Sequence, residues 1–328
     1  MASPPLVSIL INNHNYGRYL RAAIDSALGQ SYPHTEVIVV DDGSTDDSRS
    51  IMADFGDRIT AIFKTQGGQA SALNAGFAAS RGDYLCLLDS DDVFMADKAQ
   101  RIVDRFRDNP KARWVYHEMD YIDADGVPLP LDRFPDQGDI DTLHERRAHY
   151  GDGRPVDFRD MLRSGRRLEY ACPALSALSF RRSALGAVMP VPESIASASD
   201  EFPKIAALAL FEGLHLGTVL AHQRIHGNNA VTGRTDGQLE SALRYLNTAY
   251  HLRSRFAQVA PTTDSWFARS LGELIGAGGL RRAMAHTEGR LYIARFFGLQ
   301  TWLRQGPRIA FHALRTRGAQ MRNGHIHP

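Results

Sequence analysis

The sequence is poor in cysteine, in net charge and in long apolar runs, and each shortage excludes a class of protein. Two cysteines in 328 residues, Cys86 and Cys172, cannot form a disulfide framework, so we expect both to be small buried hydrophobic side chains. A formal net charge of +1 predicts no overall attraction to nucleic acid, and we expect no such partner. No uncharged apolar stretch approaches the roughly twenty residues that span a bilayer, and the N-terminus lacks a signal peptide pattern. The expected location is the cytoplasm, with peripheral contact to the inner face of the cytoplasmic membrane left open.

Several phosphate-binding and metal-binding signatures are missing as well. The chain contains no G-x-G-x-x-G and no Walker lysine loop, which disfavours dinucleotide-binding and P-loop proteins. Neither acidic cluster has the spacing with a closing Glu that a calcium-binding EF-hand loop needs. In VVDDGS, Val40 stands where the aspartyl nucleophile of a haloacid-dehalogenase-like enzyme would be. The acidic clusters therefore need another explanation.

Short apolar runs alternate with segments of helical periodicity in the first half of the chain. This alternation predicts βαβ units, and therefore an α/β fold with a mainly parallel sheet. The expected strands are Leu6–Ile11, Val37–Val40, Ile59–Phe63, Tyr84–Leu88 and Trp114–Tyr121. The expected helices are Tyr19–Leu28, Asp46–Phe55, Gln69–Ala79 and Lys98–Phe106.

The second half of the chain has a less regular pattern. Residues 123–168 are rich in Pro, Gly and Asp, and predict an irregular excursion with a hairpin at Asp125-Gly126. A helix near Glu201–Glu212 and a strand Leu214–Leu220 are expected next, followed by the loop AHQRIHGNNA. Residues 236–328 predict several helices. The expected interruptions between those helices are Pro261, Gly276-Ala277-Gly278-Gly279 and Gly306-Pro307.

Two acidic clusters follow predicted strands directly. In LCLLDSDDVF, residues 85–94, Asp89, Asp91 and Asp92 come after an apolar run, and Asp41-Asp42 follow an earlier strand. Because ligands in open α/β sheets lie beyond the carboxyl ends of the strands, we expect both clusters to face one site. Like charges so close repel unless they are paired or bound to metal. A D-x-D spacing with hard oxygen ligands suits Mg²⁺ or Mn²⁺ bound together with phosphate oxygens, which predicts a diphosphate-bearing substrate.

Four ordered segments carry a resemblance to a known family. They are VSILINNHNYGRYLRAAIDSALGQSYPHTEVIVVDDGSTDDS, QGGQASALNAGFAASRGDYLCLLDSDD, SDEFPKIAALA and QRIHGNN. In this order they resemble the inverting nucleotide-sugar glycosyltransferases of family 2, which have the GT-A fold, over roughly residues 5–230. The resemblance implies a Rossmann-like, mainly parallel central sheet flanked by helices, followed here by a C-terminal helical extension.

The same resemblance implies which residues hold the sugar donor. Asp41 and Asp42 would accept hydrogen bonds from the nucleoside base, with Gly43 allowing its close approach. Asn74 would hydrogen-bond to the ribose or hold the neighbouring loop. Many relatives have Arg where this chain has Leu73, which puts the choice of uracil in doubt, although a UDP-sugar is favoured. The implied donor-binding residues are Asn12, Asp41, Asp42, Gly43, Gly67, Gly68, Asn74, Asp89 and Arg224.

Catalysis by an inverting transferase needs a base and a group that stabilises the leaving diphosphate. By the resemblance the base is Asp200, in the first turn of a predicted helix, with Glu201 as the alternative. Asp89, Asp91 and His226 would bind Mn²⁺ or Mg²⁺, and Arg224 would neutralise charge on the leaving group.

The C-terminal segment differs from the rest in charge. Residues 286–328 contain seven arginines and one acid, Glu288, among several aromatic side chains. Arginine with apolar surface is typical of an interfacial membrane helix; the alternative, which we expect, is a helical subdomain that packs its aromatics on the catalytic core and leaves its arginines solvated. We place the domain boundary between a catalytic domain, residues 1–232, and an Arg-rich helical extension, residues 233–328.

The acidic clusters predict a bound metal and a diphosphate-bearing substrate, and the family resemblance implies that the protein is an inverting glycosyltransferase. It would move a sugar from a nucleotide diphosphate to a glycan or lipid-linked acceptor, and the resemblance implies a role in surface polysaccharide synthesis. Two alternatives stay open. One is a GT-A-like protein that binds nucleotide sugar or glycan without turnover. The other, a nucleotidylyltransferase, is disfavoured because INNHNYGRY lacks the glycine-rich basic loop of that class.

Overall fold

The computed structural model describes residues 3–130, 140–165, 174–195, 199–227, 229 and 238–322. It divides into two compact units. The first comprises residues 1–159, 168–193 and 203–229, and the second comprises residues 160–167, 194–202 and 230–328. Cys172 lies outside the described residues.

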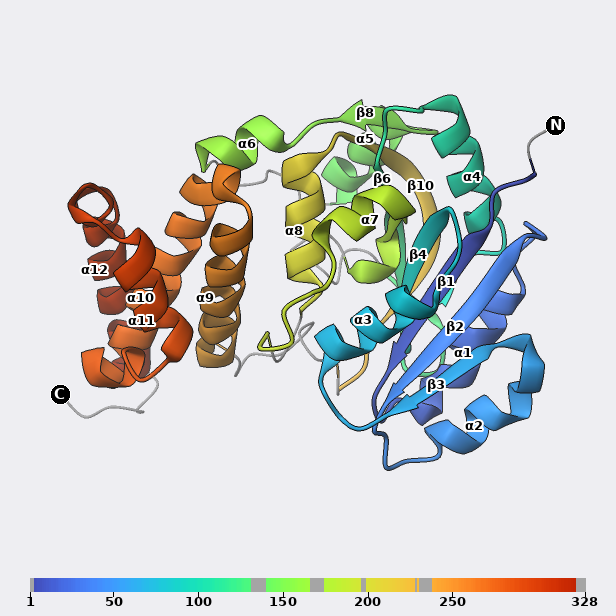
Figure 1. The fold of residues 1–328 in the computed structure, drawn as a ribbon, viewed down its shortest axis with the longest axis horizontal. Helices are drawn as coiled ribbons and strands as arrows, with labels where there is room; N and C mark the ends of the chain where they lie inside the picture. Colours follow the sequence, from blue (N-terminus) through green and yellow to red (C-terminus); the bar gives the residue numbers. More distant parts are fainter. Residues whose placement is uncertain are drawn as a thin grey trace. The chain divides into compact units, whose positions relative to one another are not determined.

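The first unit is an α/β structure around one mixed sheet (Figure 1). The strand order is β3-β2-β1-β4-β9-β6-β10-β5, with β7 paired to β6 and β8 paired to β10. The longest ladders, β1 with β2, β1 with β4, and β6 with β10, are parallel, as the sequence predicts. The strands are β1 (Val7–Asn13), β2 (Thr35–Asp42), β3 (Thr60–Lys64), β4 (Tyr84–Asp89), β5 (Val93–Phe94), β6 (Trp114–Ile122), β7 (Pro128–Leu129), β8 (Arg154–Val156), β9 (Leu178–Arg181) and β10 (Gly213–Arg224).

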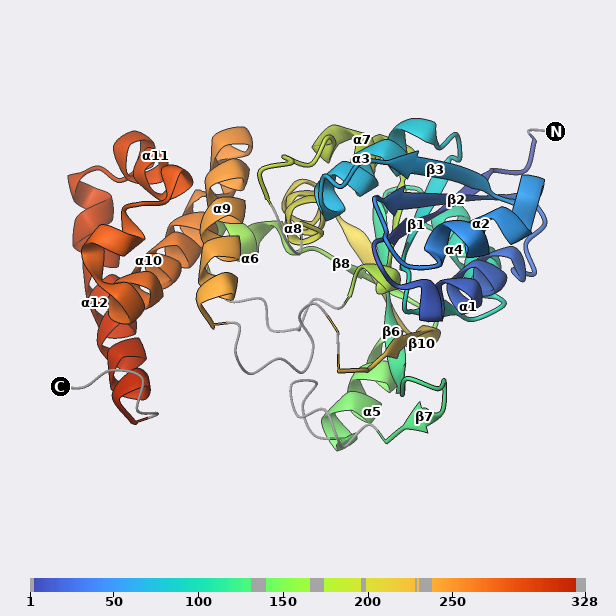
Figure 2. The same ribbon diagram turned by 90° about the horizontal axis from the view of Figure 1, so that it is seen from below.

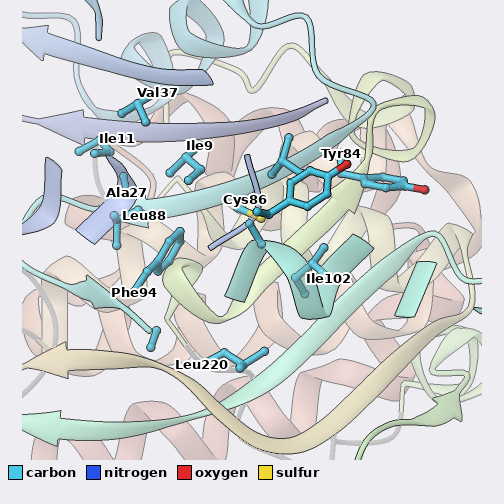
Figure 3. Packing of buried hydrophobic residues seen from close by; sticks show 14 of the residues in the cluster. Ile9, Ile11, Ala27, Val37, Tyr84, Cys86, Leu88, Phe94, Ile102 and Leu220 are labelled. Atoms are coloured by element: carbon cyan, nitrogen blue, oxygen red, sulfur yellow. The ribbon is translucent and has the colours of Figure 1, made fainter. Parts of the chain in front are cut away.

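Helices accompany these strands. Side chains on both faces of β1 and β4 are buried, as is typical of central parallel strands, and the middle of each strand is apolar. Ile9 and Ile11 of β1 pack with Cys86 and Leu88 of β4 in one core cluster, in which Cys86 is fully buried as predicted (Figure 3). The helices assigned wholly or mainly to this unit are α1 (Gly17–Leu28), α2 (Ser48–Phe55), α3 (Gln69–Ala79), α4 (Lys98–Asp108), α5 (Ile140–Tyr150), α7 (Arg182–Val188) and α8 (Glu201–Leu210).

Three sequence predictions for this unit need correction. The described parts of the segment 123–168 are less irregular than expected, since they contain α5, β8 and α6 (Arg159–Ser164). The predicted strand at 214–220 continues to Arg224, so the first four residues of the expected loop AHQRIHGNNA are strand paired with β5 and β6. The antiparallel strand β9 was not expected. The hairpin at Asp125-Gly126 is confirmed: Asp123 N–H donates to Val127 O, and Gly126 has a φ of +87°.

The second unit is a bundle of helices with its own core (Figure 2). Tyr292 stacks on Phe267 at 4.1 Å, and its hydroxyl donates to Asp264. The expectation that the aromatics of this segment pack on the catalytic core was wrong for Tyr292 and Phe297, which belong to the bundle's own cluster. No helix in the described ranges is both long and apolar enough to cross a bilayer. The bundle's long helices are α9 (Gln238–Arg255), α10 (Ala260–Ala283), α11 (Thr287–Phe296) and α12 (Leu299–Arg322).

Two glycines of α10 pack closely against α12. A Cβ on Gly272 would lie 2.5 Å from Ile309 O, and one on Gly276 would lie 2.3 Å from Ala313 O. The two helices therefore approach more closely than a side chain would allow. The helical geometry of α10 breaks at Gly279, where φ is +77°. This break confirms the predicted interruption at 276–279. The predicted interruption at Pro261 is also confirmed, because α9 ends at Arg255 and Pro261 lies in the first turn of α10. The predicted interruption at Gly306-Pro307 is wrong, because α12 continues through both residues.

Candidate active site

Three parallel strands bring the predicted polar residues to one edge of the sheet. In the β1–β4 ladder Asn12 lies opposite Asp89, and in the β1–β2 ladder Asn13 lies opposite Asp41. The two acidic clusters thus end strands on either side of β1. Among the described residues, the amide oxygen of Asn12 is buried and has no hydrogen-bond partner. Such an atom is costly to bury unless a ligand pairs with it.

Asp41 is fully buried and held by three donors. Its carboxylate accepts hydrogen bonds from Asn13 Nδ2 at 3.2 Å, Ser44 N at 3.3 Å and Arg49 Nε at 3.0 Å. A buried carboxylate needs such compensation, because its charged form is strongly disfavoured away from water. These contacts fix the turn after β2. Contact between Asp41 and a nucleoside base stays a prediction.

Asp42 is compensated in the same way. Its carboxylate pairs with Lys64 Nζ at 2.5 Å and accepts from the backbone N–H groups of Gly67 at 2.9 Å and Gly68 at 2.7 Å. Gly43 and Gly68 have φ values of +75° and +85°, and a Cβ on Gly43 would lie 2.7 Å from Gln66 N. The glycines thus permit the close approach of the two loops that Asp42 joins.

Asn74 holds a neighbouring segment of the chain. Its amide makes a double contact with the backbone of Val191: Nδ2 donates to Val191 O at 2.9 Å, and Val191 N donates to Oδ1 at 2.8 Å. Of the two roles expected from the sequence, the structure contains the loop contact. Asn74 thereby joins α3 to the segment before α8.

The Asp89–Asp92 loop is a tight turn at the end of β4. Asp92 N–H donates to Asp89 O at 3.0 Å, and Arg224 N–H donates to Asp92 Oδ1 at 2.9 Å. Burial, and next the charge of Asp91, raise the pKa of the Asp92 carboxyl well above its ordinary value. The protonated form of Asp92 is therefore favoured relative to an exposed aspartate.

Asp91 is joined to the loop after β10. His226 Nε2 lies 3.1 Å from Asp91 Oδ2, and Asn229 Nδ2 donates to the same oxygen at 3.3 Å. The His226 ring stacks on Tyr19 at 4.6 Å and meets Tyr16 edge-on at 5.6 Å. The structure therefore brings together two of the predicted metal ligands, a carboxylate and an imidazole.

The third predicted ligand, Asp89, contributes to the same electrostatic environment. Burial, and then the charges of Asp91 and Asp89, raise the pKa of the Tyr16 hydroxyl to about 12. Within the ranges the structure describes, no three or more His, Cys, Asp or Glu side chains are grouped as a metal site. Of the three predicted metal ligands, Asp91 and His226 are in contact, but the three side chains do not form a complete metal site by themselves.

Arg224 is a buried connector. Its Nε donates to Asp91 O at 2.8 Å, and one terminal nitrogen donates to Asp123 O at 3.0 Å and Ala124 O at 3.3 Å. The guanidinium also lies 5.1 Å from the centre of the Tyr19 ring. These contacts fix the acidic loop to the 123–126 hairpin. The expected contact with a leaving diphosphate stays a prediction.

A second buried connection comes from Ser176, just before β9. Asp89 N–H donates to Ser176 Oγ at 3.0 Å, and Lys98 Nζ donates to Ser176 O at 2.6 Å. Lys98 is fully buried, with its ammonium 3.5 Å from the centre of the Phe94 ring. Burial lowers the pKa of Lys98 to about 7.

Asp200, the predicted base, lies in the turn that precedes α8. It is half-buried, and the neighbouring Ser199 O accepts a hydrogen bond from Phe202 N. Residues 194–202, which include Asp200 and Glu201, belong to the second unit. The assignment of either residue as the base stays a prediction.

Sequence reasoning missed several residues of this site. Tyr16 and Tyr19 surround His226, Lys64 neutralises Asp42, and Ser176 and Lys98 support the acidic loop. The aromatic pair in NYGRY directly after β1 was a usable signal, since it follows a strand end. No local signal marks the other contacts, because their partners lie at least 22 residues away.

Comparison with known proteins agrees with this geometry. The family model described as glycosyl transferase family 2 matches residues 8–161. An uncharacterized glycosyltransferase of Nostoc sp. is 36% identical over 228 residues, which is 68% of this chain and 66% of that protein. The chain belongs to glycosyltransferase family 2.

Other relatives match over shorter stretches. An uncharacterized glycosyltransferase of Rickettsia prowazekii is 46% identical over 96 residues, 29% of this chain and 30% of that protein. The chain thus aligns with less than two thirds of the length of these relatives. Among solved structures, S. aureus TarS 1-349 in complex with UDP-GlcNAc superposes with a TM-score of 0.56 at 16% identity, covering 92% of this chain and 79% of TarS. The fold is that of the GT-A glycosyltransferases.

Proposed function

We propose that this family 2 glycosyltransferase is a metal-dependent, inverting enzyme that uses a nucleotide diphosphate sugar. The observation that carries the proposal is the contact between Asp91, which follows β4, and His226, which follows β10. Asp41 and Asp42 end β2, which pairs with the other side of β1. A carboxylate and an imidazole from separate loops converge there, at the edge where α/β sheets bind ligands.

The donor atoms of this site fit a divalent cation. Mg²⁺ and Mn²⁺ are commonly bound by one or two carboxylates, with substrate phosphates and water completing the shell, so a complete cage of protein ligands is not required. Asp91 and Asp89 would supply carboxylate oxygens and His226 a nitrogen. When bound, the cation would neutralise charge on the leaving diphosphate.

The chain's own residues would bind and orient the donor. The unpaired amide oxygen of Asn12 could accept from a donor hydroxyl at the same edge. Gly43 and Gly67 allow the protein's own loops to pack closely beside Asp42, which would hold the loops that line the donor site in place. TarS was solved with UDP-GlcNAc, which supports a UDP-sugar as the donor. Many relatives have Arg where this chain has Leu73, so the identity of the nucleoside base is left to experiment.

Asp200 is our proposal for the base. It would accept the proton of the acceptor hydroxyl as that oxygen attacks the anomeric carbon, on the face opposite the diphosphate. A position before the first turn of α8 favours the ionised carboxylate that a base requires. The acceptor we propose is a glycan or a lipid-linked glycan of a surface polysaccharide, which rests on family membership.

A thermal-shift panel tests donor and metal together. The full chain is heated with UDP-, GDP-, dTDP- and CDP-sugars, each with and without Mn²⁺. A ligand that binds the folded state raises the melting temperature, so we expect one nucleotide sugar to do so and Mn²⁺ to increase the shift. Asp91→Asn should abolish the Mn²⁺-dependent part. A shift that is equal with and without Mn²⁺ would contradict the proposed metal role.

Turnover separates an enzyme from a binding protein. With the donor found in the panel, release of the nucleoside diphosphate is measured in the presence of candidate acceptors. We expect Asp200→Asn to retain the thermal shift and lose release, because it removes the proton acceptor without altering the donor contacts. Release that persists in Asp200→Asn would assign the base to another residue.

A further inference from the structure

One surface of the second unit is unusual for a globular protein. Helix α12 exposes a row of large apolar side chains: Leu299 is 76% exposed, Leu303 71%, Phe311 59% and Leu314 74%. We call this row the α12 outer face. Contiguous exposed apolar surface on a soluble protein usually marks a site of interaction with another molecule.

The spacing of these residues shows that they form one face. Leu299, Leu303 and Leu314 are separated by four and eleven residues, which brings them to the same side of a helix with 3.6 residues per turn. The opposite side carries Thr301, Ile309 and Thr316, which are buried. The close contact of α10 with Ile309 O and Ala313 O occupies that side. The helix therefore uses one face for the bundle core and leaves a second apolar face uncovered.

A row of arginines runs beside the α12 outer face. Arg304, Arg308 and Arg315 are exposed and separated by four and seven residues, so they too share one side of the helix. Arg308 donates to Gln305 of the same helix and to Ser265 of α10, which fixes its guanidinium beside α10. The sequence of α12 contains five arginines and no acidic residue. An apolar row flanked by cations complements a surface that is apolar inside and anionic outside.

We propose that the α12 outer face binds an anionic lipid membrane. Leucine and phenylalanine side chains would enter the boundary between headgroups and acyl chains, and the arginine row would meet the lipid phosphates. The long arginine stems allow this, because their methylene groups cover apolar surface while the guanidinium stays with the headgroups. A second copy of this chain is a poorer occupant, since it would bring one cationic helix against another with no acid on α12 to pair them.

Vesicle flotation of the full chain tests the proposal. Phosphatidylcholine vesicles with and without phosphatidylglycerol are mixed with the protein, and the fraction that floats is measured. We expect flotation with the anionic vesicles, weakened by raised salt, because the arginine contacts are screened. No flotation of the unmodified protein would overturn the proposal.

Two sets of variants assign the binding surface. Leu303→Glu with Leu314→Glu should reduce the bound fraction about tenfold or more, because two charges would enter the interface. The matched control is Val127→Glu, which changes a residue 57% exposed in the first unit and should float normally. Flotation of the double variant at the unmodified level would exclude the α12 outer face.

The arginine row is tested separately and does not depend on the apolar variants folding. Arg304→Gln with Arg315→Gln should lower binding to anionic vesicles several-fold and remove most of its salt dependence. Arg107→Gln, at an exposed position of α4, is the control. Light scattering on the same proteins examines self-association. A dimer that Leu303→Glu with Leu314→Glu disrupts would assign the face to a second copy and overturn the membrane proposal.

Discussion

The aspartates after β2 and those after β4 end strands of the same sheet, yet their charges are balanced in different ways. Asp41 and Asp42 each contact a cationic side chain, Arg49 and Lys64, as well as backbone or side-chain amides. The carboxylates of Asp91 and Asp92 instead contact His226, Asn229 and the backbone N–H of Arg224.

Arg224 lies beside the second cluster but does not neutralise its carboxylates. It is the arginine that touches the second cluster, but its guanidinium donates to main-chain carbonyls, Asp91 O among them, rather than to a carboxylate oxygen. Its side chain shapes the loop, and the charge of the aspartates there is less fully compensated than after β2. A bound cation is stabilised most by carboxylates whose negative charge no protein cation already neutralises. The first cluster should therefore matter mainly for stability and the second mainly for activity.

Among these variants, Asp91→Asn should have the largest effect on activity, with little effect on stability. An amide is a weaker ligand for a hard cation, so we expect sugar transfer to fall by about 10³-fold, or about 4 kcal/mol in activation free energy. The melting temperature of the metal-free protein should be unchanged or slightly higher, because a like charge beside Asp92 is removed. Initial rates and thermal unfolding measure both. Substantial loss of stability with retained activity would reverse the roles of the two clusters.

Asp42→Asn should show the opposite pattern. It leaves Lys64, whose side chain is only 20% exposed, without its carboxylate, and we expect the free energy of unfolding to fall by about 3 kcal/mol. The control is Asp54→Asn, which removes an exposed pair with Arg21 and should change stability by about 0.5 kcal/mol or less. Urea unfolding of the three proteins makes the comparison. Equal small losses would mean that the contact of Asp42 with Lys64 is not structural.

The strands and helices of the first half were predictable because their signals are local. The apolar run of β4, the helical pattern of α3 and the turn residues Asp125-Gly126 each define an element without reference to distant residues, and the structure contains all three. Strand β9 could not be foreseen. Its four residues LSFR are too short for a periodic signal, and its place between β4 and β6 depends on antiparallel pairing with strands that lie far away in the sequence.

The candidate site was predictable to a similar degree. The family resemblance pointed to both Asp91 and His226, 135 residues apart, and the structure brings them into contact. It gave Asn74 two roles, and the contact with Val191 is the loop contact, one of the two. It could not anticipate that Arg224 would bind carbonyls or that Lys98 would meet Ser176, because such long-range contacts leave no local pattern. The predicted break at 276–279 occurs at Gly279, but the close approach of Gly276 to Ala313 O of α12 had no local signal, because a glycine needed for close helix packing looks, in sequence, like a helix end.

His226→Gln tests the second cluster more gently than Asp91→Asn. The imidazole contact to Asp91 is lost while the polar character of the side chain is kept, and we expect Mn²⁺ affinity in the presence of donor to fall about tenfold. Titration calorimetry measures it, with His34→Gln as the control at a histidine whose ring instead meets Tyr32. Unchanged affinity would leave His226 as a packing partner of Tyr19 alone.

Lys98→Met tests the pH dependence of stability. Burial lowers the pKa of Lys98 from 10.5 to about 7, so between these values the unfolded chain binds a proton that the folded protein does not. The free energy of unfolding contributed by Lys98 therefore rises with pH across this window and is lost as the pH falls toward 7, by up to about 1.4 kcal/mol per pH unit. Methionine does not titrate. As the pH falls from 9 to about 7, the unmodified protein should therefore lose stability relative to Lys98→Met. If the difference in unfolding free energy is the same at pH 9 and pH 7, Lys98 stays charged in the folded protein. Its charge would then help to neutralise the acidic loop, which would contradict the claim that the charges of Asp91 and Asp92 are incompletely compensated.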